Sequence, residues 1–454
     1  MARPTPACLA EPLTAFMSNH PAVRFVRLLW IDLTGTTRAR VLTAVRFGQG
    51  LRGKWLLRIG GNFLALADNE APLNVCNPAW SVGQCCLVAD PTSIRLWPSD
   101  KIHAVVFCYF AKPTENPASD IQYHELCPRH NLHRSLQSAR DIGLELLVGT
   151  EIEFVCTKSP RADSSIEVQQ VSGLRCLESF MLPILCEVSE HLGQGNILVQ
   201  QFYAEGGEGQ YEIALEPCPP TEALDALVLT REIIWNVCHR HGVQVSFHPR
   251  VGTPGRWAYN GVHLNISLHG EVLAKGKVDG QFIAGAFDHI DSLFAFGLPH
   301  PECYHRTQPN QQAIGRFKSW GTENRTVPVR RKGDHLWEFR FLDATANLYL
   351  FLAALTAVGA DGMEKEAQLT LSDCSVDPSR VDTEERTRFG ITQELPSDVD
   401  SSFAALRSDH LLGSALGDHL VSTYLALMEA YNKKLEHKGE VGSSERYDWL
   451  AKRL

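Results

Sequence analysis

The sequence predicts a compact α+β protein, with a small β-rich part followed by a larger part in which strands and helices alternate. The chain has 454 residues, which is enough to bury a large core. Its composition, 44% hydrophobic and 21% charged, excludes disordered and fibrous classes. Short apolar runs bounded by turn residues come first in the chain, and helical periodicity follows.

The first part of the chain has two strand-turn-strand patterns. Residues 23–42, VRFVRLLWIDLTGTTRARVL, place a polar turn at Asp32 to Gly35 between two apolar runs, which predicts a hairpin. Residues 83–98, GQCCLVADPTSIRLWP, repeat the pattern with a break at Asp90, and their adjacent cysteines indicate a strand interior. We therefore expect a β-rich domain of about 100 residues here.

Helical patterns dominate the remainder. Pro128 suits the first turn of a helix that Gly143 would end, and residues 221–242 form a second apolar-faced helix. Residues 420–435 repeat apolar side chains at helical spacing, which indicates a packing face. Two tracts rich in charge, Ser and Pro, Lys158 to Glu167 and Asp373 to Glu394, are expected to be exposed loops.

Charge and cysteine usage exclude several classes of function. With 43 basic and 52 acidic residues, the net charge of −9 does not favour nucleic acid or an anionic membrane. The thirteen cysteines include no C-x-x-C, so we expect neither a disulfide framework nor a zinc ribbon. The N-terminal residues lack an apolar signal core, and no run of about 18 apolar residues follows. We expect a cytoplasmic protein.

Four strand-like segments carry an unusual polar face. Side chains two residues apart point to the same side of a strand, while the residues between them point to the other side. The paired positions are Glu151 and Glu153 in GTEIEFVC, Gln210 and Glu212 in GQYEIALEP, His263, Asn265 and Ser267 in GVHLNISL, and Glu338 and Arg340 in HLWEFRFLD. Each segment would pack its apolar side and offer ligands on the other.

For any one strand, a solvated outer face is the simpler interpretation. Outer faces, however, usually mix Lys, Thr and Ser, whereas these strands share carboxylates, with Glu205 preceding the second strand in AEGGEGQYE. Converging carboxylates repel one another unless a cation lies between them, so the pattern predicts bound divalent metal. Oxygen ligands with one imidazole favour Mg²⁺ or Mn²⁺ over zinc.

Arginines supply the complementary charge. Arg325 and Arg330 lie five apart in ENRTVPVRR, Arg306 is upstream in CYHRT, and Arg340 lies on a carboxylate strand. Guanidinium groups bind phosphate and carboxylate bidentately, so metals with arginines predict phosphoryl transfer. No P-loop or Rossmann glycine motif is present in the sequence.

Over nearly its whole length the sequence resembles the glutamine synthetase family. The resemblance runs through FVRLLWIDLTGTTRAR, LVADPTSIRLWP, EGGEGQYEI, NGVHLNISL, ENRTVPVR and LWEFRFLDATANLYLFLAALTAVGADGM, in that order. It implies a β-grasp domain at 20–112 and, at 120–454, a catalytic domain with a curved antiparallel sheet flanked by helices. It also implies homo-oligomeric rings with active sites shared between neighbouring subunits.

The resemblance assigns roles to individual residues. The first metal would be bound by Glu153, Glu205 and Glu212, and the second by Glu151, His263 and Glu338. The clamps for phosphate and the transition state would be Arg325, Arg330 and Arg340, with Ser267 also contacting the nucleotide. The substrate carboxylate would be bound by Arg306, next to the loop at Asn260 and Gly261. The implied chemistry is attack of a carboxylate on ATP, followed by capture of the acyl phosphate by an amine.

One departure from the family pattern bears on the amine. The family places a glutamate on a flap that deprotonates ammonium, whereas this chain has TQPNQQAIG with Gln312 at that position. An amide cannot accept that proton at neutral pH. The acidic ammonium-site residue of the family's N-terminal domain has no clear counterpart, and the loop at NGVH is shorter than the family's NGSGMH.

The leading hypothesis is therefore an ATP-dependent carboxylate-amine ligase that joins glutamate or another acid to an amine other than ammonia. Two alternatives stay open: ordinary glutamine synthetase activity with an altered flap, and a non-catalytic protein with a structural or regulatory role. Inward-facing carboxylates argue against the last, because a purely structural role has no evident need for them.

Overall fold

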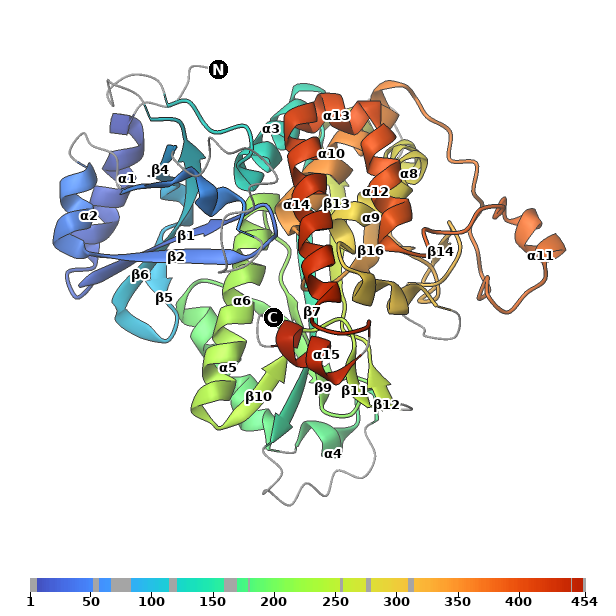
Figure 1. Ribbon diagram of the computed structural model, residues 1–454, viewed down its shortest axis with the longest axis horizontal. Helices are drawn as coiled ribbons and strands as arrows, with labels where there is room; N and C mark the ends of the chain where they lie inside the picture. The colour runs from blue at the N-terminus through green and yellow to red at the C-terminus, as the bar shows by residue number, and fades with distance from the viewer. Residues whose placement is uncertain are drawn as a thin grey trace.

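The computed structural model describes residues 6–51, 57–66, 83–113, 121–158, 170–178, 180–253, 256–274, 279–308, 314–441 and 443–451. Figure 1 shows the N-terminal elements, drawn in blue, packed beside a larger body that holds the remaining sheet and most of the helices. The fold is α+β, as predicted from the sequence.

The N-terminal part is a six-stranded sheet in the order β2-β1-β6-β4-β3, with β5 paired to β6. The central strands β1 and β6 are parallel, and the other pairs are antiparallel. The elements are α1 (Pro6–Asn19), β1 (Phe25–Ile31), β2 (Thr37–Thr43), α2 (Ala44–Leu51), β3 (Leu57–Gly60), η1 (Gly61–Leu64), β4 (Gln84–Ala89), η3 (Pro91–Ser93), β5 (Arg95–Trp97) and β6 (Asp100–Ala111).

The predicted hairpin at residues 23–42 is confirmed as β1 and β2. The Asp32 carboxylate closes its turn by accepting hydrogen bonds from the backbone of Thr34 (2.9 Å) and Thr36 (3.1 Å). Gly35 takes the left-handed conformation, with φ of 81°, that this turn requires. Cys85 and Cys86 lie buried inside β4, as expected for a strand interior.

The larger part is built on an eight-stranded sheet in the order β14-β15-β16-β13-β7-β9-β8, with β10 paired to β7. Only β14 and β15 pair in parallel among these strands. The strands are β7 (Glu145–Lys158), β8 (Val199–Ala204), β9 (Gln210–Leu215), β10 (Val243–Ser246), β13 (Val262–His269), β14 (Trp320–Thr322), β15 (Val329–Gly333) and β16 (Leu336–Leu342), and a separate hairpin comprises β11 (Val251–Thr253) and β12 (Arg256–Ala258).

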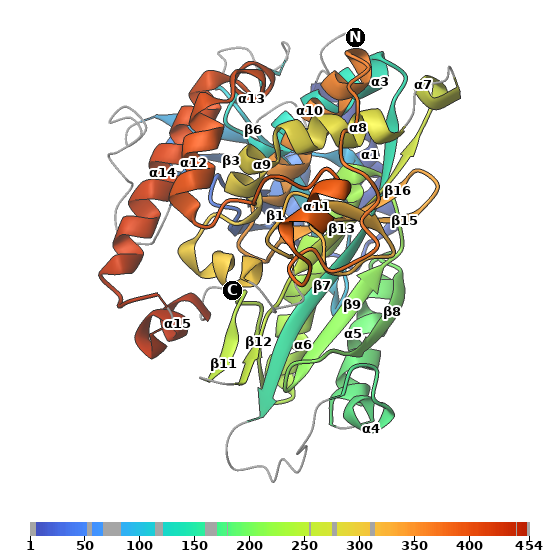
Figure 2. The ribbon, with the colours of Figure 1, turned by 90° about the vertical axis from the view of Figure 1, so that its right-hand side faces the viewer.

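Helices surround this sheet, with α5 and α6 beside its β7–β10 end, α4 next to β8, and α8, α9, α10, α12, α13 and α14 gathered at the opposite end (Figures 1 and 2). They are α3 (Pro128–Asp141), α4 (Leu174–Leu177), α5 (Met181–Gln194), α6 (Pro220–Arg240), α7 (Glu271–Ala274), α8 (Asp279–Asp288), α9 (Ile290–Gly297), η4 (Pro301–Thr307), α10 (Leu348–Glu364), α11 (Thr383–Arg388), α12 (Val399–Ser408), α13 (His410–Leu416), α14 (Asp418–Glu436) and α15 (Ser444–Ala451). Helix α10 is apolar and buried along nearly its whole length, and it packs against α3, α8, α9 and α13.

The predicted helices at Pro128, at residues 221–242 and at residues 420–435 are confirmed as α3, α6 and α14. The apolar faces of the four ligand-bearing strands are buried, as their alternation predicted. Among the described residues, no helix combines the length and the apolar character needed to cross a bilayer.

The expectation of an exposed loop at Asp373 to Glu394 is wrong in part. This tract contains helix α11, which projects from the body (Figure 1), and it buries Cys374 and Ile391. The helix forms because the Asp382 carboxylate accepts the backbone N–H of Glu385 and caps its first turn. Of the other predicted loop, residues 159–167 lie outside the described residues.

Candidate active site

Strand register brings the polar faces predicted from the sequence into one row across the sheet. Glu212 lies opposite Glu153, Glu151 lies opposite His263, and Asn265 lies opposite Glu338. Directly opposed residues of antiparallel strands point to the same face, so these side chains meet above the sheet. A bulge between Val262 and Leu264 shifts the pairing with β16 at His263.

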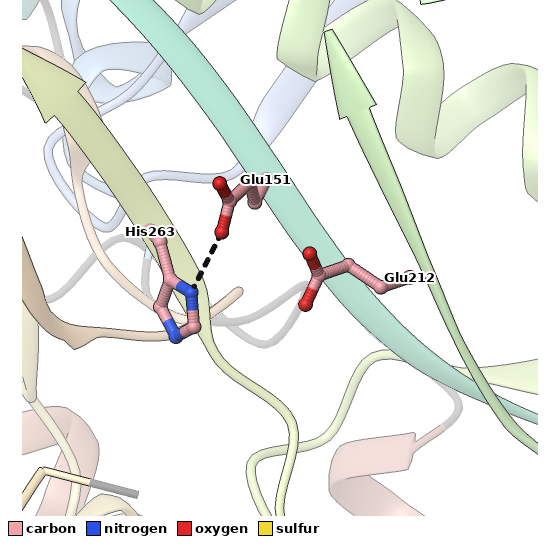
Figure 3. Close-up of side chains that lie close together, drawn as sticks. All are labelled: Glu151, Glu212 and His263. Carbon is pink, nitrogen blue, oxygen red and sulfur yellow. Dashed lines mark hydrogen bonds and ion pairs between the residues drawn. The ribbon is translucent and has the colours of Figure 1, made fainter. Parts of the chain in front are cut away.

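His263 links two of the carboxylates. Its Nδ1 lies 3.1 Å from Glu151 Oε2 and 3.2 Å from Glu338 Oε1, and its Nε2 lies 4.0 Å from Glu153 Oε1. Figure 3 shows Glu151, Glu212 and His263 converging from three neighbouring strands. One ligand atom from each of these three lies within 4.8 Å of the others.

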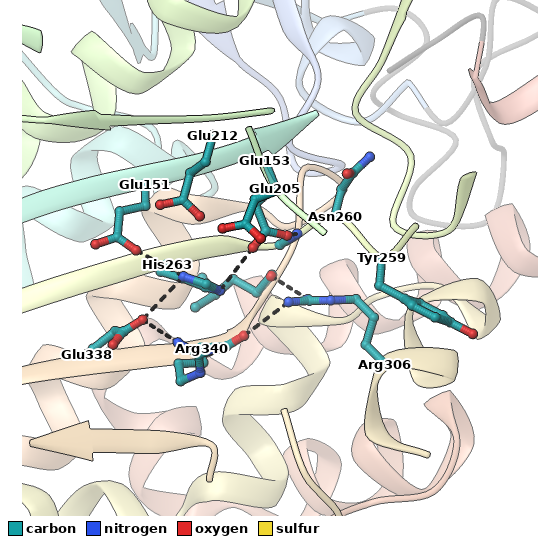
Figure 4. Close-up of polar contacts among 12 residues, drawn as sticks. Glu151, Glu153, Glu205, Glu212, Tyr259, Asn260, His263, Arg306, Glu338 and Arg340 are labelled. Carbon is teal, nitrogen blue, oxygen red and sulfur yellow. Dashed lines mark hydrogen bonds and ion pairs between the residues drawn. The ribbon is translucent and has the colours of Figure 1, made fainter. Parts of the chain in front are cut away.

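The other carboxylates lie at the β8–β9 side of the row. Glu212 is buried and accepts a 2.5 Å hydrogen bond from the Tyr203 hydroxyl, while Glu153 accepts one from the backbone N–H of Gly261 at 2.6 Å. Glu205 is half-buried at the start of the turn that leads into β9. Figure 4 shows Glu153, Glu205 and Glu212 side by side and facing His263.

The pKa shifts show that negative charge is concentrated here. Burial raises the pKa of Glu212 well above its usual value, and the neighbouring Glu151 and Glu153 raise it further. Burial and Glu153 raise the pKa of Glu205. Burial also opposes ionisation of Glu151, but the hydrogen bond from His263 and the charge of Lys332 lower its pKa overall. The Glu205–Glu212 side therefore has more negative charge than its surroundings balance.

This donor set fits a divalent ion. Among the described residues, no Lys or Arg comes within 4.0 Å of the carboxylates of Glu153, Glu205 or Glu212. Carboxylate oxygens with a single imidazole suit Mg²⁺ or Mn²⁺, and a cation among them would remove the repulsion that raises the pKa of Glu212. Glu151, Glu153, Glu205, Glu212, His263 and Glu338 are the residues that could hold such ions.

Two buried arginines contact the Glu338 carboxylate. Arg340 Nη1 lies 2.6 Å from Oε1, and Arg330 Nη1 lies 3.0 Å from Oε2. Arg330 also pairs with the exposed Glu323. The Nε atoms of both arginines are buried without a hydrogen-bond partner. Two guanidinium groups are thus fixed beside the carboxylate row, where they could receive an anionic group.

A third buried arginine, Arg306, lies at the end of the row near Asn260. Its guanidinium donates to the backbone oxygens of Leu342 (2.5 Å) and Arg340 (3.3 Å), and its Nε has no partner. Asn260 is 1% exposed and donates to the backbone oxygen of His248 at 2.9 Å. A Cβ atom on Gly261 would lie 2.4 Å from Arg306 Nη2, so glycine permits this close approach.

Two other predicted site residues, Ser267 and Arg325, are not part of this row. Ser267 shares the face of His263 but is four residues further along β13, which is about 13 Å in a strand. Arg325 is exposed, although its charge offsets a small part of the rise that burial and Glu153 cause in the pKa of Glu205. Gln312 lies outside the described residues.

The site also contains residues that the sequence interpretation did not assign. Lys332 on β15 places Nζ 3.3 Å from Glu151 Oε1 and 2.9 Å from Asn265 Oδ1. Tyr203 lies directly opposite Glu212 on β8. The same two-residue alternation would have placed Lys332 on the face of Arg330, but Tyr203 could be found only from strand register.

Comparison with known proteins shows the family to which the chain belongs. Residues 125–447 match the family model of the glutamine synthetase catalytic domain. The chain is 31% identical over 455 residues to protein fluG of Emericella nidulans, covering 97% of this chain and 50% of that protein. The chain thus spans about half the length of that relative.

A second relative is similar over almost its full length. The chain is 30% identical over 456 residues to gamma-glutamylpolyamine synthetase GlnA3 of Streptomyces coelicolor, covering 94% of this chain and 93% of that protein. The glutamine synthetase of Pyrococcus horikoshii is 26% identical over 416 residues, covering 87% of this chain and 86% of that protein. The chain belongs to the glutamine synthetase family.

Solved structures share the fold. A GmaS complex with ADP superposes with a TM-score of 0.78 at 20% identity, covering 97% of this chain and 99% of that chain. A structure described as a novel glutamine synthase homolog has a TM-score of 0.74 at 24% identity, covering 95% and 99%. The glutamine synthetase fold inferred from the resemblance is therefore confirmed.

Proposed function

We propose that this protein is an ATP-dependent carboxylate-amine ligase that forms an amide through an acyl phosphate and uses an amine other than ammonia. The observation that supports it best is the row of acidic residues and His263 flanked by the buried guanidinium groups of Arg306, Arg330 and Arg340. Such a row combines positions for cations with donors for two anionic substrates.

The proposed role of each residue follows from its position in the site. Arg306, which has an unpartnered buried Nε beside Asn260, would hold the substrate carboxylate. Arg330 and Arg340 would stabilise charge on the phosphoryl group as it transfers. Bound divalent ions would neutralise the nucleotide phosphates. The segment η4, which carries Arg306, and the strands β15 and β16, which carry Arg330 and Arg340, would thus orient the attacking carboxylate toward the phosphorus atom.

The choice of amine rests on Gln312 and on the relatives. An amide at the flap position neither attracts ammonium nor accepts its proton, whereas an organic amine can also be held by apolar contacts. A relative that is 30% identical over most of both chains is named a gamma-glutamylpolyamine synthetase. Polyamines are therefore the first amines to test, with glutamate as the acid.

The test is phosphate release from MgATP with glutamate and, in turn, ammonia, hydroxylamine, alkylamines, arylamines and polyamines. We expect release that depends on an organic amine. Efficient release with ammonia would contradict the exclusion of ammonia, and the absence of release with any pair of acid and amine would contradict the ligase proposal.

A pair of variants links that activity to the site. Glu338→Gln removes the charge that Arg330 and Arg340 contact and should abolish turnover and weaken Mn²⁺ binding. Glu145→Gln changes an exposed carboxylate on β7, outside the row, and should leave both unchanged. Wild-type turnover in Glu338→Gln would show that the site is wrongly assigned.

A further inference from the structure

A lysine is embedded in the carboxylate row. Lys332 lies two residues after Arg330 on β15, and its side chain is 28% exposed. Its ammonium group lies 3.3 Å from Glu151 Oε1 and 2.9 Å from Asn265 Oδ1. A divalent ion bound by Glu151 and His263 would therefore lie next to the ammonium group of Lys332, so that two positively charged groups would share the same carboxylate.

The contacts of Glu151 leave little room for both cations. Glu151 Oε1 receives Asn265 Nδ2 at 2.9 Å as well as Lys332, and Oε2 lies 3.1 Å from His263 Nδ1. Asn265 joins the group, because it donates to Glu151 and accepts from Lys332. Because Oε1 already has two partners, an ion that binds this oxygen must displace Lys332 or Asn265, and an ion on Oε2 would bring its charge close to Lys332.

Of these partners, Lys332 is the one most able to move. Asn265 and His263 have short side chains on the central strand β13, whereas lysine carries a single point charge on a flexible stem. Lys332 is also more open to solvent than His263, whose side chain is 6% exposed. Repulsion by an incoming divalent ion would therefore act mainly on Lys332.

We propose that Lys332 is a built-in counter-ion of Glu151 that competes with the divalent ion at this position, and that it binds the nucleotide phosphates once the ion has displaced it. This inference rests on the proposed function, because it requires a nucleotide and a divalent ion at the row. It predicts opposite effects of the lysine on two ligands: Lys332 weakens binding of the ion alone and strengthens binding of the nucleotide.

The discriminating variant is Lys332→Met, which removes the charge and keeps most of the side-chain length. Arg331→Met is the matched control, because Arg331 is the next residue on β15 and its guanidinium lies over the Trp337 ring at 5.7 Å, away from the row. Both variants lose one positive charge from one strand. Circular dichroism and thermal unfolding establish that each is folded.

Mn²⁺ binding without nucleotide, followed by electron paramagnetic resonance of the free ion, should be about tenfold tighter in Lys332→Met than in wild type. MgADP binding by calorimetry should be about tenfold weaker. Arg331→Met should change neither. Mn²⁺ affinity that is unchanged or lower in Lys332→Met would overturn the proposal, because a lysine that only supports the site would make both ligands bind more weakly when removed.

Amine-dependent phosphate release by the same preparations separates this result from failure of the proposed function. Wild-type turnover together with unchanged Mn²⁺ affinity in Lys332→Met would reject only the counter-ion role. Absence of turnover and of Mn²⁺ binding in the wild-type protein would reject the ligase assignment, and the counter-ion role with it.

Discussion

Gly261 contributes no side chain to the site, but the site depends on the space that a side chain at this position would fill. A Cβ atom there would lie 2.4 Å from Arg306 Nη2 and 3.0 Å from His263 Nε2. Gly261→Ala should therefore displace the imidazole of His263 and the guanidinium of Arg306, which is proposed to bind the substrate carboxylate. We expect kcat/KM for the acid to fall by about 100-fold, the usual effect of misplacing a reacting group by about 1 Å.

Gly193→Ala is the control for this prediction, because a Cβ at Gly193 on α5 meets nothing within 4 Å. Steady-state kinetics of both variants, with unfolding midpoints to confirm their fold, make the comparison. Equal kcat/KM for Gly261→Ala and wild type would show that Arg306 and His263 need not hold their present positions.

Much of the candidate site could be predicted at the scale of the residue, because side-chain direction in a strand repeats every two residues. That local rule placed Glu151 with Glu153 and Glu338 with Arg340. It could not place Tyr203 against Glu212 or Lys332 against Glu151, since both contacts depend on which strands become neighbours. The roles assigned to the arginines and to Ser267 remain predictions.

At the scale of the element, the first turn of α10 connects the two sheets. The Asn347 side chain accepts the backbone N–H of Leu350 as the N-cap, and it donates to the backbone oxygens of Asp32 and Leu33 in the β1–β2 turn. Asn347→Ala removes a cap and also leaves buried carbonyls unpaired. It should lower the free energy of unfolding by about 2–4 kcal/mol.

Asp382→Ala is the matched control, because Asp382 caps the exposed helix α11 and its cap contact is a surface one. Asp382→Ala should lower the free energy of unfolding by about 1 kcal/mol or less. Urea denaturation of both variants measures the difference. If the two variants lost equal stability, the contact with the β1–β2 turn would contribute nothing beyond the cap.

A pH-sensitive contact joins α9 to α13. His289 Nδ1 lies 2.7 Å from Asp409 Oδ2, and this hydrogen bond raises the pKa of His289. Burial opposes ionisation of Asp409, but the bond from His289 and its cap contact with Leu412 lower its pKa overall. The raised pKa of His289 stabilises the fold at pH values below the ordinary histidine pKa, and this stabilisation is lost as pH rises through the raised pKa. The lowered pKa of Asp409 stabilises the fold at pH values above the ordinary aspartate pKa, and this stabilisation is lost as pH falls through the lowered pKa.

The pair therefore contributes most between about pH 4 and 6.5. We expect His289→Gln to lower the unfolding midpoint more at about pH 5.5 than at about pH 9, where the imidazole is neutral in both states. Thermal unfolding of wild type and variant across this range measures the difference. A constant difference at all pH values would mean that the contact does not depend on the histidine charge.

Elements were predicted best where the pattern was long and regular. Helices α3, α6 and α14 followed from their apolar spacing, and β1 with β2 from the turn between them. Helix α11 was missed because charge and Ser content were given more weight than Asp382-Thr-Glu-Glu385, a helix-start signature within the same tract. The order of strands in the larger sheet is not encoded by any local pattern, and the family resemblance implied only a curved antiparallel sheet flanked by helices.

At the scale of the whole molecule, one buried guanidinium joins the N-terminal sheet to the helices behind the site. Arg129 on α3 lies 2.6 Å from Asp90 Oδ2, at the end of β4, and 2.6 Å from Asp225 Oδ2 on α6. Tyr349 on α10 donates to Asp225 Oδ1 at 2.7 Å. Four elements that are distant in sequence thus share one network, and all of it is buried.

Removing the centre of this network should affect both parts of the protein. Arg129→Ala leaves two buried carboxylates without their cation, which costs about 3–5 kcal/mol because charge in a low-dielectric interior needs a partner. Arg388→Ala breaks an exposed pair with Glu384 on α11 and should cost less than about 0.5 kcal/mol. In Arg129→Ala, hydrogen exchange should rise in β4 and in α6 together. Faster exchange in only one of them would show that the network stabilises a single part and does not join the N-terminal sheet to the body that carries the site.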